Sequence, residues 1–145
     1  SVFNSLFVGW PKGLLLDGTV GNTPTMAVNN TLQIEKTILA GMTANFEAAS
    51  GTPAVPYSVT EIQAYFEDAS RGNSDIQTVT DIIGASPLSL TSPVLLPAGG
   101  ASFLTGASLT PAKLTGFTSV AYRGAFGTTN WTSGWCNFDP QNTAY

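Results

Sequence analysis

The residues that could carry out chemistry are few, because the chain contains no histidine and one cysteine. Without histidine, neither a Ser-His-Asp triad nor a histidine-based metal site can form, and the lone thiol cannot form an internal disulfide. Paired carboxylates could still cleave a glycosidic bond, since that reaction requires two acids flanking the bond. The acids to consider are Glu61, Glu67, Asp68, Asp75 and Asp81.

The first three of these acids fall on the exposed face of a predicted helix, where carboxylates are ordinary solvated residues. A lyase that combines a basic residue with acid-bound calcium would draw on Lys12, Asp17 and Lys36. No acid cluster has the spacing of a calcium loop, so calcium stays an unsupported alternative. We assign no catalytic residue, no metal and no cofactor, and we predict that the chain is not an enzyme.

Exposed aromatic rings offer a second chemistry, because sugars stack on them. A packed core or cap is the commoner use of such large side chains, whereas a stripe on the surface would favour glycan binding. The candidate stacking residues are Trp10, Trp131 and Trp135.

The composition limits the class of protein. Hydrophobic residues make up 43% of the 145 residues and charged residues 10%, against about 25% charged in an average soluble domain. Abundant Gly, Ser, Thr, Asn and Pro indicate many short strands and tight turns, so the predicted class is mostly β. The five basic residues are dispersed, which excludes nucleic-acid binding through a basic patch, and no apolar run is long enough for a membrane span.

A repeat near the start predicts how these strands are arranged. The segment 2–10 matches the segment 34–42 in its apolar, polar and glycine positions, an offset of 32 residues. Such a repeat of short strands is typical of a solenoid, although two unrelated strands would look similar. Stacking would place Leu6 and Ile38 in one inward ladder, and Gly9 and Gly41 at one corner with positive φ.

A helix follows this repeat. Ser58 and Glu61 have capping-box spacing, and apolar residues recur at helical spacing from there, which predicts a helix over about 59–70 that covers the end of the array. The sequence predicts that 43–57 is an excursion from the coil and that 75–84 forms either a strand or a second helix. The stretch 87–97 is predicted to be an extended strap along the surface. The predicted fold is therefore the terminal coils of a parallel β-helix (1–57), a capping helix (58–72), and an extended strap with an irregular aromatic-rich cap (73–145), all in one structural unit.

The aromatic C-terminus resembles a known family. The carrying residues are the segment from Tyr122 to Gly127, then Asn130-Trp131-Thr132, Gly134-Trp135 and the segment from Asn137 to Thr143, with Asn4 to Pro11 also similar. They resemble the C-terminal region of large Bacteroidota surface or secreted proteins, often lipoprotein-like, that are right-handed parallel β-helices mostly of unassigned function. The resemblance implies a bacterial cell-surface, outer-membrane-associated or secreted location. Cys136 departs from the family, which has Thr there, and we expect it to be a small buried hydrophobe.

The expected function depends on an open strand edge. Ser1 leads straight into an apolar run, so we expect other residues to precede it. A coil that began at Ser1 would expose unpaired backbone groups along its edge, which other polypeptide would have to cover. The candidate pairing edge is formed by Val2, Phe3, Asn4, Leu6 and Val8. The sequence predicts a structural capping module whose edge pairs with upstream coils, another copy or a surface-complex protein. The alternatives are a glycan-binding or polysaccharide-degrading module and a self-assembling filament subunit.

Overall fold

The computed structural model describes residues 1–48, 58–83 and 89–144. These residues form three small sheets and three α-helices. The strands are β1 (Val2–Phe3), β2 (Leu6–Val8), β3 (Lys12–Leu16), β4 (Ile34–Glu35), β5 (Ile38–Ala40), β6 (Ala44–Ala48) and β7 (Ser74–Gln77). The helices are α1 (Thr23–Val28), α2 (Val59–Glu67) and α3 (Val79–Ile83), followed by the 3-10 turns η1 (Ser102–Leu104) and η2 (Ala112–Leu114).

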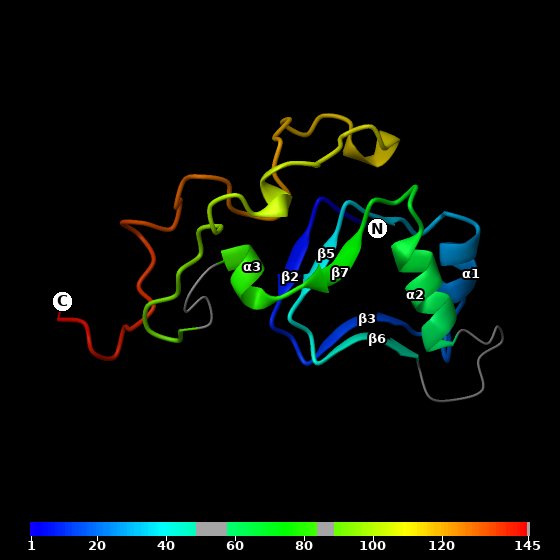
Figure 1. The fold of residues 1–145 in the computed structure, drawn as a ribbon, viewed down its shortest axis with the longest axis horizontal. Helices are drawn as coiled ribbons and strands as arrows, with labels where there is room; N and C mark the ends of the chain where they lie inside the picture. The colour runs from blue at the N-terminus through cyan, green and yellow to red at the C-terminus, as the bar shows by residue number, and fades with distance from the viewer. Residues whose placement is uncertain (49–57, 84–88, 145) are drawn as a thin grey trace.

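All the strand pairs are parallel. β1 pairs with β4 and β3 pairs with β6, while the third sheet has the order β2-β5-β7. Figure 1 shows β2, β5 and β7 side by side, with the β3–β6 pair beside them and α1 and α2 toward one end. α3 and the C-terminus lie toward the other end, and the yellow part of the C-terminal segment (89–144) lies above the strands in this view. The first row of strands, β1 to β3, therefore lies against a second row, β4 to β6.

The register confirms the predicted offset of 32 residues. Leu6 lies opposite Ile38, and Val2 and Lys12 have partners at the same separation. Gly9 and Gly41 have φ values of 71° and 62°, the left-handed conformation expected at a shared corner. The repeated pattern of apolar residues and glycines thus determines which strands pair.

The predicted fold class is nevertheless wrong. The described residues form no closed solenoid: two of the sheets contain two strands and the third contains three. α1 and α2 interrupt the strands, and the described residues beyond Gln77 add helices, turns and bends but no further strand. The protein is a mixed α/β structure rather than the end of a parallel β-helix. Two rows are fewer than the three repeats that a stable stack needs, so helices and irregular chain supply the remaining cover.

The core is divided between the two faces of the β2-β5-β7 sheet. Leu39 is buried in one cluster with Phe46, Ile62 and Phe66, which lies within the space bounded by the three strand pairs. Ile38 is buried in a second cluster, with Ile82 and Phe103. The Leu6–Ile38 ladder therefore exists, but it faces α3 and the C-terminal segment rather than that first space.

α2 closes the far side of the second row. Ser58 accepts a hydrogen bond from the Glu61 N–H at 3.2 Å, and the Glu61 carboxylate accepts one from the Ser58 N–H at 2.8 Å, which confirms the predicted capping box. The helix ends at Glu67, and Phe66 packs against Phe46 with ring centroids 5.5 Å apart. The helical stripe therefore serves as a cover for β6 and the first cluster.

Three local predictions need correction or completion. The stretch 43–57 contains β6 over 44–48 rather than an excursion, and residues 49–57 lie outside the described residues. The ambiguous stretch 75–84 divides into β7 and α3, with residue 84 outside the described residues. The predicted strap has neither helix nor strand over 89–97, and residues 87–88 are not among those described.

Candidate functional site

The first row of strands has one backbone edge that faces away from the second row. The Ile38 N–H donates to the Ser5 carbonyl at 2.9 Å and the Gly9 N–H donates to the Ala40 carbonyl at 2.9 Å. In this parallel register the backbone groups of Leu6 and Val8 point away from β5. The same pattern turns the backbone groups of Phe3 outward on β1.

The β3 strand continues this edge. The Ala44 N–H donates to the Pro11 carbonyl at 3.0 Å, which places the backbone groups of its register partner Lys12 on the outer side. Alternation along β3 turns the backbones of Leu14 and Leu16 the same way. Among the described residues, no strand pairs with this side of β1, β2 or β3. The β3 part of the edge was not among the predicted residues, although the 32-residue offset indicates it.

Two residues of the predicted edge are already engaged. Val2 donates its N–H to the Gln33 carbonyl at 2.8 Å, so its backbone faces β4. Asn4 donates to Glu35 and accepts from the Gly124 N–H at 2.7 Å, and its side chain forms two hydrogen bonds with the Ser108 backbone. Phe3, Leu6 and Val8 remain as outward-facing positions from the predicted set.

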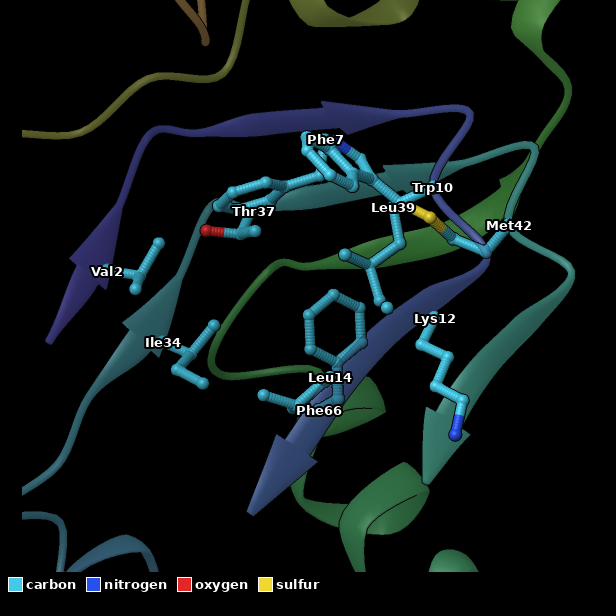
Figure 2. A pocket seen from close by; sticks show the side chains of 11 residues that line it. Val2, Phe7, Trp10, Lys12, Leu14, Ile34, Thr37, Leu39, Met42 and Phe66 are labelled. Carbon is cyan, nitrogen blue, oxygen red and sulfur yellow. The ribbon is translucent and has the colours of Figure 1, made fainter. Parts of the chain in front are cut away.

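An apolar hollow opens on one side of β2. Figure 2 shows side chains from all three strand pairs and from α2 around this inner hollow, which has a volume of about 320 Å³. Phe66 and Leu39, which are buried, form part of its wall, and Val2 and Leu14 line it from β1 and β3. The Lys12 ammonium group points away from the other labelled side chains and pairs with Glu47.

A second hollow, of about 220 Å³, lies along the same strand. Its lining includes Leu6 and Val8 from one face of β2 and Phe7 from the other face. Leu6 and Val8 belong to the face of β2 that packs on the cluster of Ile38, Ile82 and Phe103, whereas Phe7 also lines the inner hollow, so the two hollows share residues of β2. Phe103 and Phe126 from the C-terminal segment form part of its other wall, and we call it the outer hollow.

The inner and outer hollows meet at β2. Phe7 and Trp10 line both, and their side chains are 41% and 62% exposed. A strand laid along β2 would direct alternate side chains into the two hollows, because its period is also two residues. The arrangement therefore joins free backbone groups to apolar space on both sides of them.

Arg123 brings a positive charge to the outer hollow. Its Nη2 donates to the Ser102 carbonyl at 3.1 Å, and its backbone N–H donates to the Phe103 carbonyl at 2.7 Å. Its Nε is shielded from water and has no hydrogen-bond partner among the described residues. Burial lowers the pKa of Arg123, since the charged form is desolvated. Arg123 was not among the predicted site residues, because no local sequence pattern marks it.

The predicted stacking residues are separated into two places. Trp131 stacks on Phe126 at 5.1 Å and on Trp135 at 5.7 Å, with interplanar angles of 14° and 24°. The indole N–H groups of Trp131 and Trp135 donate to backbone carbonyls at 2.9 and 2.6 Å. Trp131 is 50% exposed and Trp135 is 68% exposed, so neither ring is buried in a core. Trp10 lies instead at the border of the two hollows.

The acids predicted as alternatives for chemistry are held by local contacts. Asp17 accepts from the Thr19 hydroxyl at 2.6 Å and from the Thr19 N–H at 2.8 Å, and these bonds lower the pKa of Asp17. The backbone and side chain of Ser58 likewise lower the pKa of Glu61, and the side chain and backbone of Thr78 lower that of Asp81. Within the described ranges no three Cys, Asp or Glu side chains gather as a metal site.

Two further predictions concern the cysteine and the membrane. Cys136 is half-buried, so the expectation of a buried thiol is wrong. No helix in the described part of the chain is both long and apolar enough to cross a membrane.

Comparisons with protein-family models, with curated proteins and with solved structures found no match for this chain. The resemblance to Bacteroidota surface proteins stays a prediction, as does the surface or secreted location that it implies.

Proposed function

We propose that this chain is a non-catalytic structural module that binds another polypeptide by adding a strand to the outer edge of β2. The observation that supports this proposal is the outward-facing, unpaired backbone of Leu6 and Val8 on a strand whose residues line both hollows. Strand addition uses main-chain hydrogen bonds for affinity and side-chain pockets for specificity. The edge supplies the main-chain hydrogen bonds, and the two hollows supply the side-chain pockets.

The occupant that fits this site is a strand running parallel to β2 with apolar side chains on both faces. The chain already contains such a strand on the other side of β2, because β5 pairs in parallel and directs Ile38 and Leu39 to opposite faces. A second copy of the whole chain cannot add its own β5 in this way, since β5 is flanked by β2 and β7. We therefore favour a segment of another polypeptide over self-association.

The experiment uses a synthetic peptide with the sequence of residues 33–42 and the full chain. We expect saturable binding, followed by the fluorescence of Trp10 at the border of the hollows. N-methylation of alternate peptide amides gives two matched series: the series that blocks amides facing β2 should weaken binding at least tenfold, and the series that blocks the opposite amides should not. Equal effects in both series, or a stable dimer in sedimentation that excludes the peptide, would contradict the proposal.

Glycan binding is a second candidate, favoured by the exposed ring stack. Trp135 ends the stack and is 68% exposed, so a sugar ring could lie against its open face. Titration with soluble neutral hexose oligomers should quench tryptophan fluorescence in the wild-type chain and in Trp10→Ala but not in Trp135→Ala. Absence of quenching across the oligomers, or quenching that Trp135→Ala retains, would rule this candidate out.

A further inference from the structure

The outer hollow contains a charge that its surroundings do not balance. Arg123 lines this hollow together with apolar side chains from β2, α3 and the C-terminal segment. The one ion pair among the described residues joins Lys12 to Glu47, so no described carboxylate neutralises Arg123. A guanidinium in partly apolar surroundings without a counterion is costly, and an anion placed beside it offsets that cost.

The guanidinium is held in place for such a contact. A Cβ built on Gly106 would lie 3.7 Å from each of Cζ, Nε and Nη2, so Gly106 lies over one face of the planar group. Nη2 is fixed by the Ser102 carbonyl, and the backbone N–H of Arg123 is fixed by Phe103. The group is therefore anchored from the C-terminal segment while it contributes to the lining of the hollow.

Arg71 is a second partly buried arginine, and its guanidinium is stabilised by contacts within the fold. Its Nε is also buried without a partner, but its guanidinium lies 3.9 Å from the centroid of the Tyr65 ring and Nη1 donates to Asn30 at 3.1 Å. The aromatic face stabilises that cation. Arg123 lines the outer hollow instead, beside the free edge of β2.

We propose that the strand that adds to β2 carries an acidic side chain, whose carboxylate enters the outer hollow and pairs with Arg123. This inference rests on the proposed strand addition and specifies its partner. The alternation of side chains assigns the acid to a position on the face that meets Leu6 and Val8, and an apolar residue to the adjacent position, which faces the inner hollow. The partner motif is thus an acid next to a large apolar residue within one parallel strand.

The test uses variants of the 33–42 peptide with the full chain. Glutamate is placed at position 38 or 40 of the peptide, the two positions that lie opposite Leu6 and Val8 where β5 pairs with the other edge of β2. Glutamine at the same position is the uncharged control. One of the two glutamate peptides should bind about tenfold more tightly than its glutamine control at low salt, and added salt should reduce the difference.

Variants of the protein complete the cycle. In Arg123→Gln the advantage of glutamate should disappear, and in Arg123→Glu a lysine at the same peptide position should bind better than glutamate. If these variants unfold, the Nε–Hε signal of Arg123 in the wild-type chain provides the readout and should shift with the glutamate peptide more than with the glutamine peptide.

The outcomes separate the two proposals. Equal binding of glutamate and glutamine peptides with the N-methylation pattern retained would overturn the acidic partner and leave strand addition standing. Failure of every peptide to bind would overturn strand addition itself.

Discussion

A pair of proline substitutions tests whether the outer edge of the first row is free. Lys12 and Ala44 are register partners on β3 and β6, and both side chains are exposed. The Ala44 N–H donates to the Pro11 carbonyl at 3.0 Å, whereas the Lys12 N–H points away from β6. Proline removes the N–H in each case, so the two variants differ in whether that group has a partner.

The expected free-energy changes are well separated. Lys12→Pro loses the Lys12–Glu47 ion pair, which is exposed and contributes less than about 1 kcal/mol. Ala44→Pro loses a ladder hydrogen bond and leaves the Pro11 carbonyl without its donor, at a cost of about 1–3 kcal/mol. With about 2–4 °C per kcal/mol for a chain of this size, Ala44→Pro should lower Tm by about 2–12 °C.

Urea denaturation followed by tryptophan fluorescence measures the difference, and Lys12→Ala corrects for the lost ion pair. We expect Lys12→Pro to match Lys12→Ala within about 0.5 kcal/mol, the usual scatter of surface substitutions. A Lys12→Pro variant as unstable as Ala44→Pro would show that the Lys12 N–H already has a partner, which would refute the assignment of a free edge.

Three other perturbations follow from the packing and the hydrogen bonds. Phe66→Ala should destabilise the chain by about 3–5 kcal/mol in urea titration, because this ring is 1% exposed and forms part of the inner hollow's wall. Gly41→Ala should lower Tm more than Gly116→Ala, although both glycines have positive φ. A Cβ at position 41 would clash with Val79, whereas one at position 116 meets nothing within 4 Å. The backbone N–H and the hydroxyl of Ser58 lower the pKa of Glu61, so the stability from this pair is present above the ordinary value of 4.5 and is lost as pH falls through the lower folded value. Ser58→Ala removes the hydroxyl but keeps the N–H, so the free energy of unfolding should depend less on pH in that range, while Glu61→Gln should remove the dependence.

Several features of this protein could be predicted from the sequence because their causes are local. The capping box at Ser58 and Glu61 and the apolar spacing after it determine α2, since all the contacts lie within a few residues. The repeated positions of apolar residues and of Gly9 and Gly41 determine which strands pair and in which register. A one-residue shift would exchange the two faces of β2, and the pattern excludes it.

The tertiary structure decided the rest, because it depends on contacts between distant segments. The side chain of Asn4 bonds to the backbone of Ser108, 104 residues away, and such contacts place the C-terminal segment over the face of the sheet that holds Leu6 and Ile38. The fold class was predicted wrongly for the same reason. The sequence repeat that pairs two rows of strands is the same whether further coils or helices pack against those rows. The position of Arg123 beside β2 has no local signal. The sequence shows the charge of this residue, but only the tertiary structure shows that no described carboxylate lies against it.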